Sequence, residues 1–203
     1  MRRQADRLVV GHSRGQRPDG LDSMQLIKMV KKMRDEGKFL SGAELDGIPK
    51  MFIGAAANPF ADPFKIRALR LAKKVKAGVE FIQTQCIYNL DRFEKWMEMA
   101  RDLGLTEKVY ILAGITPFKS AGMAKYIKNR VPGMDVPDEV VSRMAGVPKE
   151  KQPDEGIQIC LESIDCLKKL PGVAGFHIMA IEWEEMVPEI VERSGLYPRP
   201  TVA

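Results

Sequence analysis

Residues 52–85, FIGAAANPFADPFKIRALRLAKKVKAGVEFIQTQ, indicate the fold class, because their pattern predicts a strand, a turn, a helix and a second strand. Its opening, FIGAAAN, is short, apolar and uncharged, which is typical of a strand buried on both faces of a parallel sheet. Asp62 and Pro63 predict the N-cap and the first position of the helix, and Gly78 predicts its end. Residues 81–85 predict the second strand. Two strands joined by a helix in this way form a right-handed βαβ crossover by default.

The helix within this stretch has two predicted surfaces. Apolar residues at helical spacing predict one face that packs on a sheet, namely Phe64, Ala68, Leu71, Ala72 and Val75. The basic residues, Lys73 and Lys74 among them, are expected on the remaining, solvated surface. Asn58 follows the first strand, and Thr84 and Gln85 end the second. Ligands bind at the carboxyl ends of parallel strands in α/β proteins, so these polar residues are either ligand contacts or ordinary strand ends that meet solvent.

The rest of the chain repeats the alternation of strand and helix. Strands are predicted at residues 8–11, 52–58, 81–85, 109–113 and 174–180. Helices are predicted at residues 24–36, 63–77, 120–129, 157–170 and 184–194, and a further one opens at Asn89 or Asp91 and closes at Gly104. The segment 131–153 carries four prolines and is predicted to be a long loop with a short helix at 138–144, and long loops in compact domains are usually functional.

Five parallel strands, each followed by a helix, fit either an open doubly wound sheet or part of an eight-fold (β/α) barrel. A doubly wound sheet that binds nucleotides would carry a glycine-rich phosphate loop after a strand, and the sequence has neither the G-x-G-x-x-G nor the Walker pattern. The barrel is therefore favoured, although a complete one needs three more units. We interpret residues 1–203 as a single, partial TIM-barrel domain of the α/β class, with a tail at 197–203.

Composition narrows the class of protein. The 203 residues are 45% hydrophobic and 29% charged, with a net charge of +5, which suits one globular domain. The basic residues are dispersed among acidic ones, so nucleic-acid binding is not favoured. Three cysteines without a C-x-x-C pair argue against a disulfide framework and for a cytoplasmic protein. No metal site is expected, since His12 and His177 are distant from the cysteines in sequence. No apolar run has the length of a membrane span.

Four motifs resemble the methylenetetrahydrofolate reductase family, the flavin-dependent barrel enzymes of one-carbon metabolism. They are FIGAAANP, LAKKVKAGVEFIQTQ, ILAGITP and GFHIMAIEWEEMVPEIVERSGL, which lie between residues 52 and 196, and the resemblance as a whole extends from about Leu8 to Leu196. The run from Lys73 to Gln85 is the most specific. The resemblance implies that this chain supplies the fourth to eighth strands of the barrel. The ending IMAIEWEE is more similar to the branch of the family found in acetogenic and related anaerobic metabolism.

The resemblance also implies a reaction and its partners. FAD, or alternatively FMN, would take a hydride from NADH or NADPH, or from another donor, and pass it to 5,10-methylenetetrahydrofolate to give 5-methyltetrahydrofolate. The folate is thus the expected substrate. A homo-oligomer, or a partner subunit that completes the barrel, is expected because the outer strands of a partial barrel leave unpaired edges.

The resemblance also implies roles for individual residues, according to their positions in the matching motifs. The cofactor contacts implied by the resemblance are Gly11, His12, Asn58, Asp62, Lys73 and Lys74, with the two lysines approaching the flavin phosphates. Without the resemblance, the two lysines would be interpreted as a solvated helix face. The implied substrate contacts are Gln85 and Trp183.

The chain also departs from the family pattern. Gly11-His12 stands where the family usually has Gly-Asp beside the flavin ring, Trp183 stands where many members have an arginine near the folate tail, and Met123 replaces a glutamine. The glutamate that acts as general acid in the family has no counterpart, and neither Glu80 nor Glu182 can be assigned to that role by motif.

Three hypotheses follow from the sequence. The chain is a reductase or a C-terminal fragment of one. Alternatively, it is a non-catalytic module that binds flavin or folate and completes a barrel with another chain. The third hypothesis is a truncated reading frame without an independent function.

Overall fold

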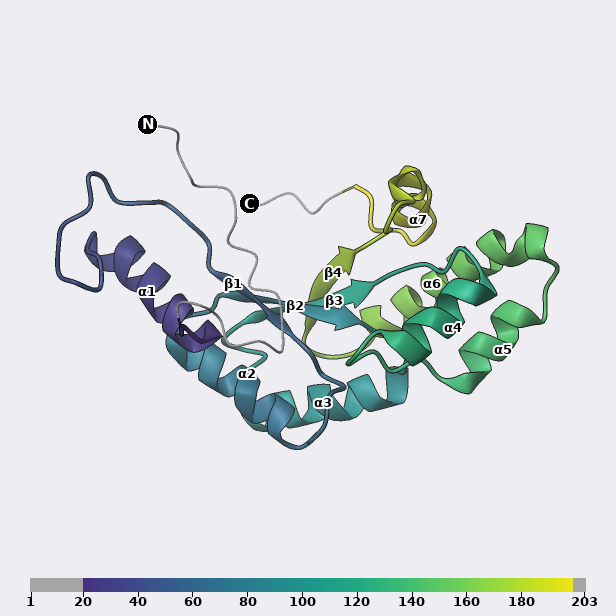
Figure 1. Cartoon of the computed structure of the whole chain (residues 1–203), viewed down its shortest axis with the longest axis horizontal. Helices are drawn as coiled ribbons and strands as arrows, with labels where there is room; N and C mark the ends of the chain where they lie inside the picture. Colours follow the sequence, from purple (N-terminus) through teal and green to yellow (C-terminus); the bar gives the residue numbers. More distant parts are fainter. Residues whose placement is uncertain (1–19, 199–203) are drawn as a thin grey trace.

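A computed structural model describes residues 20–198 of the chain. Four strands form one sheet: β1 (Gly54–Ala57), β2 (Phe81–Cys86), β3 (Tyr110–Ile115) and β4 (Val173–Ile178). The helices are α1 (Ser23–Glu36), α2 (Ile66–Ala77), α3 (Leu90–Asp102), α4 (Ala121–Arg130), α5 (Asp138–Ala145), α6 (Gln152–Lys168) and α7 (Val187–Arg193), with short 3₁₀ turns at Lys149–Lys151 and Glu184–Met186 (Figure 1). The strand predicted at residues 8–11 lies outside the described residues.

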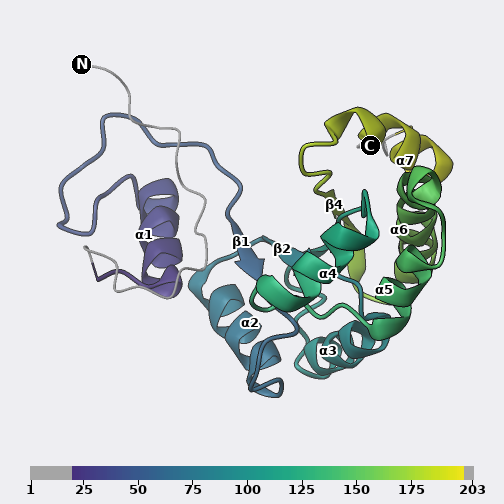
Figure 2. The ribbon, with the colours of Figure 1, turned by 45° about the vertical axis from the view of Figure 1, so that its right-hand side comes forward.

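The four strands are parallel and are ordered β1-β2-β3-β4, which is also their order along the chain. This order is that of a sheet wound in one direction, whereas a doubly wound sheet reverses direction at a switch point. Figure 2 shows α2, α3, α6 and α7 following one another along the outer side of the curved row of strands. The prediction of an α/β fold with a parallel sheet is therefore confirmed.

The hydrophobic core lies between the sheet and these outer helices. Phe93, Trp96, Met97 and Ala100 of α3 are fully buried, as the helical spacing of the sequence predicts. On the sheet side they meet residues such as Ile82 and Ile111, which are also fully buried. Cys160 is buried in α6 and Cys166 is exposed, so the two cysteines do lie on different faces of that helix.

The opposite face of the sheet carries a cluster of aromatic side chains at the amino ends of the strands. In β2, residues 82, 84 and 86 are buried toward the helices, while residues 81, 83 and 85 alternate with them and are half-buried. Phe52 stacks on Phe81 with ring centroids 5.3 Å apart, and Tyr110 lies 6.5 Å from Phe52. Phe52 is 59% exposed and Tyr110 is 62% exposed. This face thus has uncovered apolar surface.

Side chains cap three of the helices in the described part of the chain. Asp22, Asn89 and Ser120 cap α1, α3 and α4 by accepting hydrogen bonds from backbone amides, whereas the other four helices have no side-chain cap. Helix α6 begins at Gln152 instead of the predicted Ile157, because Pro153 occupies its first turn and acidic residues favour the helix amino terminus.

Helix α2 also begins at another residue than predicted. It begins at Ile66 after a turn at residues 63–65, and its N-cap is Lys65, which makes no side-chain capping bond. The prediction that Asp62 caps this helix is therefore wrong, because the Asp62 carboxylate bonds elsewhere, as described below.

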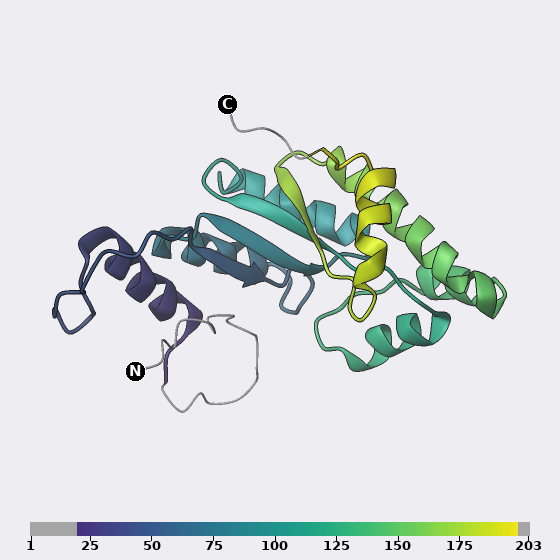
Figure 3. The ribbon, with the colours of Figure 1, turned by 90° about the horizontal axis from the view of Figure 1, so that it is seen from above.

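Helix α4 lies off the outer row and packs on α5, which in turn contacts α6. Figure 3 shows α4 beyond the arrowheads of β1 and β2, at the carboxyl edge of the sheet. A second, smaller core forms there, from residues such as Tyr88, Phe118, Ala124 and Met144. The α4–α5 connection, residues 131–137, is thereby placed near the loops that follow β1 and β2.

Candidate functional site

Polar residues gather along the carboxyl edge of the sheet, where the loops after the four strands lie. Asn58 follows β1, Gln85 is the penultimate residue of β2, and Trp183 follows β4. Gly11 and His12, also expected at the cofactor, lie outside the described residues.

Lys74 is the most deeply buried charged residue in the described part of the chain. Its side chain comes from α2, its residue is only 5% exposed, and its ammonium group donates a hydrogen bond to the backbone carbonyl of Ala56 in β1. The expectation that Lys74 lies on a solvated helix face is therefore wrong. The face of α2 that carries Lys74 packs against the end of β1, so the lysine is enclosed together with the apolar stripe. Lys73, one position earlier, is exposed.

Lys74 lines a small pocket together with Asn58, Arg67 and Arg70. Burial, and to a smaller extent the charge of Arg70, lower the pKa of Lys74 to about 8. Burial and Arg70 also lower the pKa of Arg67. Three cations are thus held close together, and an anion bound among them would relieve their mutual repulsion. The donor set therefore suits a phosphate group at the mouth of the pocket, whose inner volume of about 20 Å³ is close to that of one water molecule.

Asn58 shapes the loop that borders this pocket. Its Oδ1 atom accepts hydrogen bonds from the backbone amides of Phe60 (2.9 Å) and Ala61 (3.1 Å). This turn is favoured by asparagine, whose side chain can bond the backbone two residues on. The side-chain amide of Asn58 lies against Gly133 of the α4–α5 connection, where a Cβ atom would come within 2.1 Å of Nδ2. Glycine at 133 therefore permits a close approach between the two loops.

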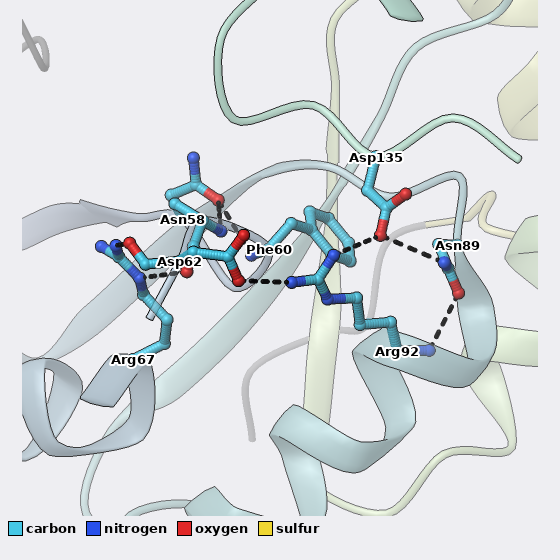
Figure 4. A network of polar contacts seen from close by, with 8 residues as sticks. Asn58, Phe60, Asp62, Arg67, Asn89, Arg92 and Asp135 are labelled. Atoms are coloured by element: carbon cyan, nitrogen blue, oxygen red, sulfur yellow. Dashed lines mark hydrogen bonds and ion pairs between the residues drawn. The ribbon is translucent and has the colours of Figure 1, made fainter. Parts of the chain in front are cut away.

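Asp62 faces Arg92 of α3 instead of the helix that follows it. Its Oδ1 atom accepts a hydrogen bond from Arg92 Nη2 at 3.2 Å, and the Asp62 side chain is 86% exposed (Figure 4). Arg92 Nη1 also donates to Oδ2 of Asp135 at 3.0 Å. Asp62 thus belongs to an ion-pair network beside the pocket and is not among the residues that line it.

Thr84 and Gln85, predicted together as polar strand-end residues, take different roles. The Thr84 hydroxyl oxygen accepts a hydrogen bond from the amide of Gly114 (2.8 Å), and its O–H donates to the carbonyl of Gln85 (2.9 Å). Thr84 is buried, so it holds β2 to β3 where their register shifts. Gln85 is half-buried on the face of the sheet turned away from the helices, where an amide could contact a ligand.

Trp183 lies beside Lys119 at the ends of β4 and β3. The Lys119 ammonium is 5.7 Å from the centre of the indole ring and donates a hydrogen bond to the carbonyl of Glu182. Glu182 has a φ of 54°, the left-handed region that non-glycine residues seldom adopt and that concentrates at functional sites. An indole and a cation in contact can accommodate an aromatic anion.

The structure brings Asn58 and Lys74 to one pocket and leaves Lys73 outside it. Sequence reasoning missed Arg67, Arg70, Arg92, Asp135 and Lys119. A local signal existed for the first two, because residues 67, 70 and 74 recur at the spacing of one helix face. Arg92 and Asp135 are 43 residues apart, and no local pattern could have paired them.

Glu80, left unassigned by the sequence, lies at the other end of β2. It accepts hydrogen bonds from Arg34 (2.5 Å) and from the backbone amide of Ile53 (2.8 Å), so it joins α1 to the amino edge of the sheet. Between residues 20 and 198, no group of three His, Cys, Asp or Glu side chains could hold a metal ion. In that same range, no helix has the length and apolarity needed to cross a bilayer.

Comparisons with known proteins agree with one family. A family model described as methylenetetrahydrofolate reductase matches residues 11–195. A probable methylenetetrahydrofolate reductase (NADPH) of Caenorhabditis elegans is 24% identical over 199 residues, which are 91% of this chain and 28% of that protein. Methylenetetrahydrofolate reductase 2 of Schizosaccharomyces pombe is 33% identical over 135 residues, which are 62% of this chain and 20% of that protein. The chain thus spans less than a third of the length of either relative.

A solved structure shares the fold. It is an uncharacterized protein from Clostridium thermocellum that binds two copies of 5-methyl-5,6,7,8-tetrahydrofolic acid, and it aligns with a TM-score of 0.58 at 14% identity, over 86% of this chain and 58% of that chain. At this identity the likeness concerns the fold alone. The family match, in contrast, extends over most of the sequence. The protein therefore belongs to the methylenetetrahydrofolate reductase family.

Proposed function

We propose that this chain binds a flavin and a folate and takes part in the reduction of 5,10-methylenetetrahydrofolate to 5-methyltetrahydrofolate. The observation that carries the proposal is the cationic pocket of Arg67, Arg70 and Lys74 beside Asn58 at the carboxyl edge of a parallel sheet. In barrel enzymes this edge is where active sites lie. Family membership supports a flavin nucleotide as the ligand of this pocket, since its phosphates would pair with such cations.

The proposed cofactor is FAD, with FMN as the alternative and NADH or NADPH as the electron donor. The preference for FAD over FMN rests on the resemblance to the family. Lys74 and Arg70 would hold the phosphates through charge-assisted hydrogen bonds. When bound, the flavin would supply the hydride for the methylene carbon.

The folate would be held by residues on the neighbouring strands. Gln85 offers both a donor and an acceptor to a pterin edge. Trp183 offers a ring for stacking against the aminobenzoyl group, and Lys119 offers a cation for the glutamate carboxylates. The acid that protonates the substrate nitrogen has no assigned residue in this chain.

The fold proposal is that β1–β4 are the fifth to eighth strands of an eight-stranded barrel. Two observations support it: the sequential parallel order of the strands, and the uncovered aromatic cluster of Phe52, Phe81 and Tyr110 on the face opposite the helices. Additional strands, from a preceding segment or from a partner chain, would cover this face and pair with the open edges of β1 and β4. We propose a cytoplasmic location on the cysteine pattern.

The test is flavin content of the purified protein. FAD and then FMN are added, unbound flavin is removed, and visible absorbance gives the stoichiometry. Methyltetrahydrofolate is then added anaerobically, and loss of the flavin absorbance reports reduction by the reverse half-reaction. Lys73→Met is the matched control for Lys74→Met, because the first lysine is exposed and the second lines the pocket.

Each outcome of this experiment supports or refutes one of the hypotheses. Stoichiometric flavin that is reduced by methyltetrahydrofolate supports the reductase, and its loss in Lys74→Met but not in Lys73→Met supports the assigned pocket. Flavin that binds but is not reduced supports the non-catalytic module. Folded protein that takes up neither flavin refutes the proposal.

A further inference from the structure

One guanidinium group joins three segments at the carboxyl edge of the sheet. Arg92 lies in the first turn of α3, and it bonds Asp62 of the β1–α2 loop at 3.2 Å and Asp135 of the α4–α5 connection at 3.0 Å (Figure 4). The three residues are separated by 30 and 43 positions in sequence. Their meeting is therefore a feature of the tertiary structure alone.

Further contacts fix the position of Arg92. Asn89 accepts a hydrogen bond from the backbone amide of Arg92 at 3.0 Å and donates from its own Nδ2 to Asp135 at 3.1 Å. The guanidinium carbon lies 5.0 Å from the centre of the Phe64 ring, within the range of a cation–π contact. The Arg92 side chain is 31% exposed, so solvent screens these interactions only in part.

The network adjoins the cationic pocket through a short loop. Arg67, which lines the pocket, donates to the carbonyls of Ala61 (2.5 Å) and Asp62 (2.5 Å). The Asp62 carboxylate is close enough to raise the pKa of Arg67 slightly against the stronger effects of burial and Arg70. Asp62 is therefore the carboxylate that can neutralise the pocket, and Arg92 is its ion-pair partner.

We propose that Arg92 is a positioning residue for the cationic pocket: it holds the Asp62 carboxylate away from Arg67 and keeps the pocket available to a diphosphate. This inference rests on the proposed function for the identity of the ligand, but its electrostatic part concerns any polyphosphate anion. Without Arg92, Asp62 and Asp135 would face each other as like charges. The free Asp62 carboxylate would then turn toward Arg67 and compete with the anion.

The test uses four proteins: the wild type, Arg92→Gln, Arg92→Gln with Asp62→Asn, and Arg101→Gln. Arg101 lies near the end of the same helix and bonds the carbonyl of Pro171, so its substitution removes the same charge away from the pocket. Binding of inorganic pyrophosphate is measured by calorimetry or by thermal shift. Binding of FAD and of riboflavin, which lacks phosphate, is measured by flavin fluorescence.

Arg92→Gln should weaken pyrophosphate and FAD by about fivefold, the effect of one partly exposed charge interaction. Riboflavin should bind as it does to the wild type, and the second substitution, Asp62→Asn, should restore most of the lost affinity. A purely structural role would instead weaken FAD and riboflavin alike and would not be rescued by removing a carboxylate.

The inference is overturned if Arg92→Gln binds pyrophosphate as tightly as the wild type, if Arg101→Gln weakens it equally, or if Asp62→Asn gives no rescue. A wild type that binds pyrophosphate but no flavin would refute the proposed function. The Arg92 inference would then be decided by how tightly the wild type and the variants bind pyrophosphate. A wild type that binds neither overturns both.

Discussion

Lys74→Met should make the folded protein more stable at neutral pH while removing its affinity for phosphate. Lys74 is buried, and its ammonium bonds the carbonyl of Ala56. Methionine has a similar unbranched shape and carries no charge, so it can fill the same space beside α2. The substitution therefore removes the free-energy cost of burying a cation but keeps most of the packing made by the side-chain methylene groups.

The expected magnitude follows from the pKa of Lys74. A fall from the ordinary value of 10.5 to about 8 means that the charged form is disfavoured in the folded state by about 3 kcal/mol at most. The lost hydrogen bond to Ala56 offsets about 1 kcal/mol of the gain. At pH 7 we expect the free energy of unfolding of Lys74→Met to exceed that of the wild type by about 2 kcal/mol.

The pH dependence has a definite sign. Below pH 8 Lys74 is protonated in both the folded and the unfolded wild type, so the penalty is fully present. Between about pH 8 and pH 10.5 the folded state releases the proton first, the unfolded state binds more protons, and wild-type stability rises relative to the variant. The advantage of Lys74→Met should therefore disappear by about pH 10.5.

Urea denaturation of the wild type, Lys74→Met and Lys73→Met at pH 7 and pH 10.5 provides the measurement. Lys73→Met, an exposed neighbour, should change stability by less than about 0.5 kcal/mol. Pyrophosphate should stabilise the wild type and not Lys74→Met. The reasoning fails if Lys74→Met is less stable than the wild type at pH 7, or if the difference between them is the same at both pH values.

Three further substitutions test other contacts. Gly156→Ala should destabilise the fold by about 2 kcal/mol or more in urea denaturation, because the new Cβ would lie 1.8 Å from the Phe118 carbonyl, although alanine normally stabilises helices. A neutral or stabilising effect would contradict this packing. Asn89→Ala should lower the free energy of unfolding by about 1 kcal/mol or more, because the α3 cap and the bond to Asp135 are both lost, whereas Asn89→Asp, which keeps the cap but places a second carboxylate beside Asp135, should recover only part of this loss. Trp183→Ala should weaken methyltetrahydrofolate by about tenfold in equilibrium titration and leave FAD unchanged, whereas equal weakening of both would place the indole outside the folate site.

The features of the fold that could be predicted are those set by interactions between residues close in sequence. The starts of α1, α3 and α4 were predicted to within one residue, because the signals for a helix start lie within one turn of it. The buried face of α3 was identifiable because helical periodicity alone selects it. The parallel order of the strands follows from the crossover rule, which depends on chain handedness and short connections.

The candidate site was only partly predictable. Asn58 and Gln85 could be placed at the carboxyl edge because a strand end is a local property. The start of α2 was misplaced because Asp62 and Pro63 carry a strong local signal, and the structure uses Asp62 in an ion pair with Arg92 instead.

Local sequence is enough to predict the strand–helix repeat, the helix faces and the edge where polar residues gather, since each depends on neighbours within about one helical turn or one strand. The burial of Lys74 could not be predicted in this way, because its environment depends on how α2 lies against β1. Likewise, only the tertiary structure joined Asp62, Arg92 and Asp135. Ion pairs between residues 30 or more apart form only when the folded loops bring their charges within reach, and no local pattern encodes that meeting.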